Sequence, residues 1–154
     1  MRSHELTTGR TFAVAFDHGD DFFPTLAAFC RANGVRHGYV PMFIAGFREV
    51  DIVGACEKLT DPDAPVWSKV NLTNVEALGA GTLAWDPATD AVLPHLHVSV
   101  GEKARSAVGH TSHLLAATVQ FLVEMVVVEV LSPTMTRPPN PALYDVPTLT
   151  FDQP

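Results

Sequence analysis

Most of the chain alternates short apolar segments with polar turns, and one segment has the periodicity of a helix. Four apolar residues recur at intervals of four, three and one, which places them on one helical face: Phe22, Leu26, Phe29 and Cys30. Pro24 suits the first turn of a helix, where its missing N–H costs little, and Gly34 suits the stop. The pattern therefore predicts one amphipathic helix over residues 21–32.

The other apolar segments have the lengths and the β-branched composition of strands. They cover residues 11–16, 39–47, 48–53, 70–85 and 93–100, separated by a surface loop at 58–66 and a turn at 86–90. Pro41 and Gly46 indicate an edge position or a bulge. Gly79 and Gly81 indicate a bulge or a close backbone approach rather than a phosphate loop, because no helix pattern follows them. Residues 114–131 are almost continuously apolar and favour one long buried strand over a helix.

These segments divide the chain into three parts. Residues 1–9 are a polar lead-in, and residues 10–131 form one domain. Residues 132–154 contain six of the twelve prolines. Because proline cannot continue a ladder or a helix, we expect this tail to form no regular element. It should run extended over the surface or over a neighbouring subunit.

The bulk composition is that of a globular domain. The chain has 154 residues, of which 47% are hydrophobic and 18% charged. The longest apolar run is interrupted by Glu124 and Glu129 and is too short to span a bilayer. The N-terminal residues lack a signal-peptide pattern, so the sequence predicts a cytoplasmic protein. Cys30 and Cys56 are widely spaced in apolar surroundings, which favours reduced core thiols over a disulfide.

The charge distribution limits the choice of partners. The formal net charge is −7, and none of the ten Lys and Arg residues is adjacent to another. A protein that holds nucleic acid through its phosphates needs a basic stripe on its surface. No such stripe is visible, which argues against direct DNA binding.

Four of the seven histidines fall between residues 93 and 113. His95 and His97 are two residues apart in an apolar segment, so in a strand both imidazoles project from the same face. His110 follows a glycine after a loop of hairpin length and could fold back opposite them. Three imidazoles from two strands, with one position open, form the ligand set of a reactive zinc site. The alternative is that these are hydrogen-bonded structural histidines.

A zinc ion held by three histidines would lower the pKa of its water ligand toward ~7 and so provide hydroxide near neutral pH. Glu76 or Glu124 would then be the candidates for a general base or for a group that orients a ligand. The alternative, which we favour, is that each glutamate is a paired or interface carboxylate.

Three motifs together resemble the plants and prokaryotes conserved domain, or PPC domain. The glycine–acidic turn and helix of residues 19–35 resemble the opening of that domain, and residues 44–50 resemble its glycine-containing segment. His95-Leu96-His97-Val98 with Gly109-His110 resembles its His-x-His and Gly-Gly-His motifs, and Glu124 lies near the position of a glutamate in its last strand. The resemblance covers about residues 10–131.

The resemblance implies an α+β fold with a mostly antiparallel β-sheet and one main α-helix, assembled as a homotrimer. It also implies a metal, usually zinc, bound by His95, His97 and His110. Val108 replaces the first glycine of Gly-Gly-His, and the spacing to Glu124 is slightly long. The third ligand is therefore either His110 or His113.

The family has no settled enzymatic activity. Its plant members join this domain to AT-hook segments and act in the nucleus, but the Arg-Gly-Arg-Pro core of an AT-hook is absent from this sequence.

Three hypotheses follow from these observations. The first is a metal-binding trimer that serves a small-molecule ligand or metal-assisted hydrolysis. The second is a regulatory module that acts on DNA directly or through a partner. The third is a structural trimer with incidental histidines.

Overall fold

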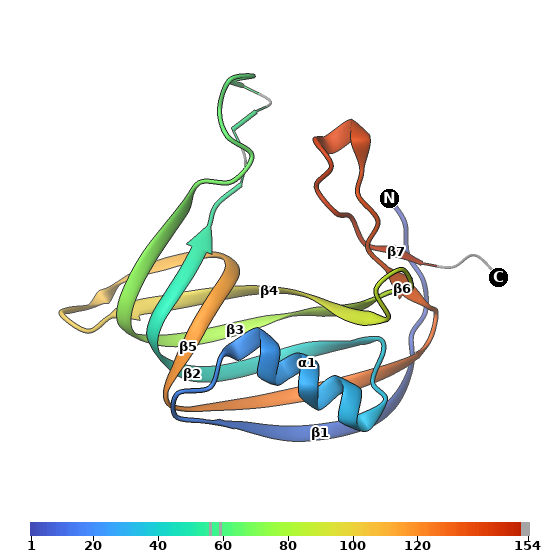
Figure 1. Cartoon of the computed structure of the whole chain (residues 1–154), viewed down its shortest axis with the longest axis horizontal. Helices are drawn as coiled ribbons and strands as arrows, with labels where there is room; N and C mark the ends of the chain where they lie inside the picture. Colours follow the sequence, from blue (N-terminus) through green and yellow to red (C-terminus); the bar gives the residue numbers. More distant parts are fainter. Residues whose placement is uncertain (56, 59, 152–154) are drawn as a thin grey trace.

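The computed structural model describes residues 1–55, 57–58 and 60–151. The elements in chain order are β1 (Thr7–Asp17), α1 (Phe22–Asn33), β2 (Gly38–Val53), β3 (Lys69–Asp86), β4 (Ala91–Glu102), β5 (Arg105–Ser132), β6 (Met135–Thr136), the 3-10 turn η1 (Pro141–Leu143) and β7 (Thr150–Phe151) (Figure 1). The strand pairs are antiparallel except for β3 with β6. The predicted fold class, a mostly antiparallel sheet with one main helix, is confirmed.

Four long strands pair in a closed circuit. β2 pairs with β3, β3 with β4, β4 with β5, and β5 pairs back with β2. β1 adds to the C-terminal half of β5. In such a circuit each strand has a partner on both sides, so its register is fixed from two directions. The histidine-bearing strand β4 is therefore held between β3 and β5.

The long strand β5 pairs with three other strands along its length, and its backbone is irregular at Phe121. Residues 122–132 pair with β1, whereas residues 109–113 pair with β4. Phe121 has a φ of 73°, in the left-handed region that bulky residues rarely adopt. Its backbone N–H donates to Nδ1 of His18 at 3.1 Å, which ties this irregular position to the turn after β1. The predicted long strand over residues 114–131 is confirmed.

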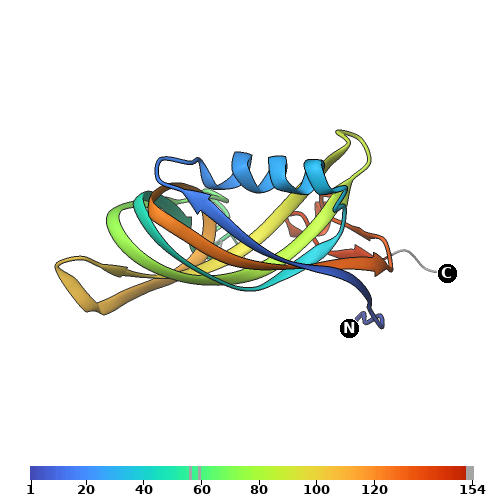
Figure 2. The same cartoon turned by 90° about the horizontal axis from the view of Figure 1, so that it is seen from below.

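Helix α1 lies across one face of the curved sheet and leaves the other face uncovered (Figure 2). Phe22, Leu26 and Cys30 are buried on the sheet side of α1, as the periodicity predicts. The ring of Phe22 packs edge-on against that of Phe47, 5.7 Å between centroids. Burial raises the pKa of the Cys30 thiol to about 11, so it remains an unreactive core group at neutral pH. Cys56 lies outside the described residues.

The predicted boundaries are close to the observed ones. The helix ends at Gly34, which has a φ of 66° and whose N–H donates to the carbonyl of Arg31. The predicted separation of residues 39–47 from 48–53 is wrong, because both belong to β2. Gly46 stays paired with Glu76 of β3, while the β2–β5 register shifts between Ala45 and Phe47, so the bulge predicted at Gly46 is confirmed. A side chain there would collide with the carbonyl oxygen of Gln120. No helix in the described part of the chain is long and apolar enough to cross a membrane.

The predicted close approach at the two glycines of β3 is confirmed. A Cβ atom at Gly79 would collide with the ring of Phe43. A Cβ atom at Gly81 would collide with the carbonyl oxygen of His95. Only glycine leaves room here for the facing strands, so these residues fix the spacing between β3 and its neighbours.

The tail forms regular elements, contrary to our expectation. β6 pairs in parallel with β3 and antiparallel with β7. Met135 is buried in a small cluster with Ala84 and Val130. The prolines limit these strands to two residues each but do not prevent them, because the segments between successive prolines remain free to pair. The tail is therefore bound to the domain through β3.

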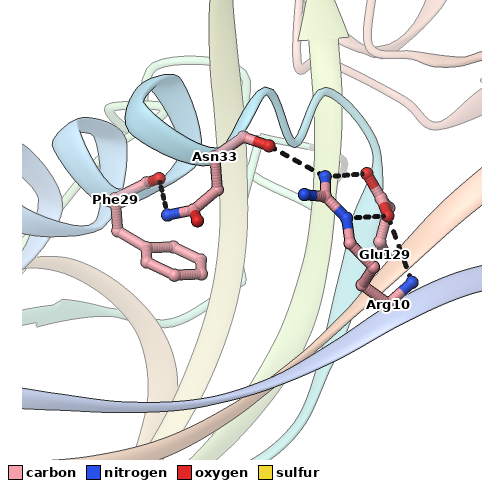
Figure 3. A network of polar contacts seen from close by, with 4 residues as sticks. All are labelled: Arg10, Phe29, Asn33 and Glu129. Atoms are coloured by element: carbon pink, nitrogen blue, oxygen red, sulfur yellow. Dashed lines mark hydrogen bonds and ion pairs between the residues drawn. The ribbon is translucent and has the colours of Figure 1, made fainter.

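A polar network ties β1, β5 and the end of α1 together (Figure 3). The guanidinium of Arg10 donates from Nε and Nη2 to the carboxylate of Glu129, at 2.8 and 2.7 Å. The same Nη2 donates to the carbonyl of Asn33 at 2.8 Å, and the Asn33 side chain donates to the carbonyl of Phe29. Hydrogen bonds from Arg10 lower the pKa of Glu129 to about 2. This network fastens the helix to the sheet edge.

We expect Glu129→Gln to lower the free energy of unfolding at pH 7 by about 1–2 kcal/mol, because it removes a buried charge that accepts hydrogen bonds from a partly exposed arginine. The folded-state pKa is lowered from 4.5 to about 2, so the charged pair stabilises the protein fully above pH 4.5 and loses its effect as the pH falls toward 2. The difference in free energy of unfolding between wild type and variant, measured by urea unfolding, should shrink as the pH falls from 4.5 to about 2.

Glu124→Gln is the matched control, since Glu124 is exposed on the same strand. A Glu124→Gln variant as destabilised as Glu129→Gln would contradict a specific role for the network.

Candidate metal centre

Strand β4 presents His95 and His97 on the face of the sheet away from the core. The intervening Leu96 and the following Val98 are buried, at 0% and 1% exposure, so strand alternation directs the histidines outward. On the neighbouring strand, Thr82 is the residue opposite His95. The predicted common face for the two histidines is confirmed.

His113 completes a group of three imidazoles. It lies directly opposite His97 in the β4–β5 register. One donor atom from each of His95, His97 and His113 lies within 4.8 Å of the others. The Nε2 atoms of His95 and His97 are 3.2 Å apart. With zinc–nitrogen distances of about 2.0–2.1 Å and tetrahedral angles, two ligand nitrogens lie about 3.3 Å apart, so this pair already has the spacing of ligands to one ion.

His110 lies apart from this group. Its Nε2 is 2.9 Å from a carboxylate oxygen of Glu102, and its partner across the ladder is the buried Val100. Two residues paired across a ladder point to the same face of the sheet, so His110 points to the core-facing side with Val100. His97 points to the other side. The structure brings His95 and His97 together with His113 and does not bring His110 to them.

A register shift at the β4–β5 turn causes this arrangement. Glu102 pairs with Arg105 at the turn, but Gly101 pairs with Gly109, so β5 contributes three more residues than β4 at this point. Without the shift, continued pairing from the turn would set His110 opposite His97. The insertion moves His113 to that position and reverses the face of His110.

Arg137 from the tail contacts the group at His95. Its Nη1 is 2.9 Å from Nδ1 of His95, and its Nη2 donates to the hydroxyl of Thr82 at 2.7 Å. Because an arginine can only donate, Nδ1 of His95 is the acceptor in this arrangement. The proton of the neutral His95 ring is then on Nε2, which faces Nε2 of His97. Arg137, itself hydrogen-bonded to Thr82, thus determines the tautomer of His95.

Burial favours the neutral form of His95 and His113. Desolvation, reinforced by the positive charge of Arg137 and by the neighbouring histidines, lowers the pKa of His95 to about 4. Desolvation, then His97 and Arg137, also lowers the pKa of His113. Both rings are therefore uncharged near neutral pH, which is the protonation state that binds metals.

Two segments flank the histidines. Trp67, at the end of the β2–β3 loop, lies beside His113 with 6.1 Å between ring centroids. The tail reaches the other side through Arg137. The loop and the tail extend beyond the same edge of the sheet in Figure 1, and Lys58 of the loop lies over the ring of Tyr144 of the tail at 5.7 Å. The site is thus bordered by segments from both.

The two glutamates considered from sequence lie outside this group. Glu76 is opposite Gly101 on β4, and Glu124 is opposite Ile44 on β2. Both side chains are exposed, and within the described residues neither makes a hydrogen bond or an ion pair. Neither carboxylate contacts the three imidazoles.

Sequence reasoning missed Arg137, Thr82 and Trp67. The pairing of Thr82 with His95 follows from the β3–β4 register, which the turn at residues 86–90 could have indicated. Arg137 had no comparable signal, because it lies in a proline-rich segment far along the chain.

The donor set fits a divalent metal ion. It consists of three imidazoles, and a neutral imidazole offers a lone pair once the proton is on its other nitrogen. His95 has to carry its proton on Nδ1 to bind through Nε2, so metal binding would release it from Arg137. The chemistry open to this arrangement is that of a three-histidine site with open positions for another ligand.

Comparison with solved structures gives the same fold. A metal-containing protein from Archaeoglobus fulgidus is 18% identical, with a TM-score of 0.80 over 99% of this chain and 100% of that one. A plant- and prokaryote-conserved (PPC) protein from Pyrococcus horikoshii is 18% identical, with a TM-score of 0.79 over 96% and 97%. A proposed DNA-binding protein from Ralstonia eutropha is 19% identical, with a TM-score of 0.74 over 91% and 90%.

No curated protein matches the sequence. The family model of the Plants and Prokaryotes Conserved (PCC) domain matches residues 3–131, which includes β2, β3, β4, all but the last residue of β5, and the three clustered histidines. The chain therefore belongs to the Plants and Prokaryotes Conserved domain family.

Proposed function

We propose that this chain is a metal-binding protein whose ion, zinc in the first instance, is held by His95, His97 and His113. The 3.2 Å separation of the Nε2 atoms of His95 and His97, with His113 in the same group, carries the proposal. The Archaeoglobus fulgidus relative, described as metal-containing, supports it. His110 is the other candidate from sequence, and we assign the third position to His113 because Glu102 holds His110.

Zinc is the preferred ion because neutral imidazoles suit it, while nickel, copper and iron accept the same ligands. A zinc ion held in this way would polarise a bound carbonyl or lower the pKa of a water molecule toward ~7. The activity that such a site would serve is binding of a small molecule or hydrolysis. Glu76 and Glu124 receive no role in it, since neither contacts the triad.

DNA binding, directly or through a partner, is the second candidate. Relatives from Ralstonia eutropha and Bacteroides thetaiotaomicron are described as proposed DNA-binding proteins. The net charge of −7 and the scattered Lys and Arg residues oppose direct binding to phosphates. We therefore rank it below metal binding.

We further propose that the chain assembles as a homotrimer. The resemblance to the PPC domain supports this state, and so does the sheet face that α1 leaves uncovered. Met42, Ile44 and Leu78 lie on that face with 37%, 42% and 56% of their surfaces exposed. Exposed apolar side chains grouped on one face are typical of a contact between subunits.

We expect the wild-type protein to retain about one zinc per chain after gel filtration, measured by elemental analysis. His95→Ala and His113→Ala should each weaken zinc binding by at least ~100-fold, because removing a ligand costs more than removing a group that only orients one. His110→Ala is the matched control and should bind like wild type.

Zinc lost from His110→Ala and kept by His113→Ala would move the third ligand to His110. No zinc in the wild type after zinc is supplied, with no rise in thermal stability, would overturn the metal proposal, since an ion that binds only the folded state must stabilise it.

For DNA, we expect no binding of a labelled duplex, followed by fluorescence anisotropy, at salt concentrations between about 50 and 200 mM. Contacts to phosphates would give an affinity that falls steeply across that range. A saturable, salt-sensitive rise in anisotropy would instead support the second candidate.

Ile44→Glu should shift the protein from trimer to monomer in light scattering coupled to gel filtration, because a buried unpaired carboxylate opposes association. Leu143→Glu is the control, since Leu143 has the same 42% exposure but lies on the tail. A wild-type monomer, or a trimer that Ile44→Glu leaves intact, would contradict this assignment.

A further inference from the structure

We propose that Arg137 is an anion-binding residue, and that the histidine site takes a small ligand with a carboxylate group. The inference names a ligand class for the proposed metal site. Its argument about the metal-bound protein rests on that proposed function. Its basis is the position of the Arg137 guanidinium beside the three imidazoles and the hydrogen bonds that it makes and leaves unmade.

Arg137 is a partly buried cation that forms no ion pair with any described residue. Its contacts are a neutral imidazole at His95 and a neutral hydroxyl at Thr82. The ion pairs of the described residues join other groups, and none includes Arg137. Taking a guanidinium out of water without a counter-charge is costly, so a cation held here points to an anion that binds beside it.

One N–H donor of the guanidinium is also unsatisfied among the described residues. Nε of Arg137 is buried and has no hydrogen-bond partner among the described residues. Buried donors in native proteins are nearly always paired, and an orphan donor at a candidate site calls for a missing acceptor. Guanidinium N–H groups are arranged in a fork that matches the two oxygens of a carboxylate.

Metal binding would free a second donor. His95 accepts a hydrogen bond from Nη1 of Arg137 at Nδ1, but binding an ion through Nε2 requires the proton to be on Nδ1. In the loaded protein, Nη1 would therefore lose its acceptor. A divalent ion, a guanidinium and three neutral imidazoles would carry three positive charges, and no carboxylate of the described residues touches them. An anionic ligand would accept hydrogen bonds from Arg137 and would balance part of the positive charge of the ion and the guanidinium.

A carboxylate fits this site better than a phosphate does. Phosphate sites combine several cations or the backbone N–H groups of a helix N-terminus. Arg137 is the cation in contact with the triad, and the sole α-helix of the described residues, α1, lies on the other face of the sheet (Figure 2). One guanidinium with one hydroxyl matches one carboxylate group.

The tail is built to hold Arg137 in place. Met135, two residues earlier, is buried against Ala84 and Val130. Thr136 pairs with Trp85 of β3, and its hydroxyl is 2.7 Å from that of Thr150. A side chain fixed by a buried anchor and a short sheet is preorganised for recognition, which lowers the entropic cost of binding.

The test is a titration of the cobalt(II)-loaded protein with sodium acetate at constant ionic strength, followed by the visible absorption of the ion. We expect saturable binding to wild type and a dissociation constant at least about tenfold higher for Arg137→Gln, the loss of one charge-assisted contact. Arg137→Lys, which keeps the charge and loses the fork, should fall between them. Arg31→Gln is the control, since Arg31 is exposed on α1, and it should stay within about twofold of wild type.

The outcomes separate the two proposals. Full cobalt content with an acetate affinity unchanged in both Arg137 variants would overturn the inference, as would tighter binding of inorganic phosphate than of acetate. If Arg137→Gln does not fold, Arg137→Lys alone decides. If the wild type binds no metal, the metal proposal fails, and calorimetry with acetate on the metal-free protein decides the inference: Arg137-dependent binding supports it, and no binding overturns it.

Discussion

The antiparallel register between β4 and β5 is the constraint on which the candidate site depends. Side chains on a strand alternate between faces, so shifting β5 against β4 by an odd number of residues moves each β5 side chain to the other face. Such a shift changes which histidine of β5 shares a face with His95 and His97. The three-residue shift beside the turn is such a change, and it selects His113 in place of His110. The closed circuit of β2, β3, β4 and β5 then holds that register from both sides.

Much of the fold could be predicted because its signals are local. The helix follows from the spacing of Phe22, Leu26 and Cys30, and its end follows from Gly34. The common face of His95 and His97 follows from strand alternation alone. Each of these features depends on residues close together in the sequence, where periodicity and backbone preferences carry the information.

The rest depends on contacts that sequence spacing does not encode. Uninterrupted pairing after the two-residue turn at Lys103-Ala104 would have set His110 opposite His97, as the sequence motif implies, but the extra residues of β5 beyond Arg105 change the register. The prolines of the tail concealed β6 and β7, because proline density argues against strands without excluding pairs of two residues. Arg137 reaches His95 across 42 positions of sequence, a contact that only the tertiary structure produces.

The contact between Arg137 and His95 joins the region that the family model matches to the segment that follows it. The three clustered histidines lie within residues 3–131, the region that the family model matches, whereas Arg137 lies beyond it. A substitution in the C-terminal segment can therefore change the surroundings of His95 while β4 and β5 keep their sequence. The fold and the three histidines then stay the same while the groups beside them differ.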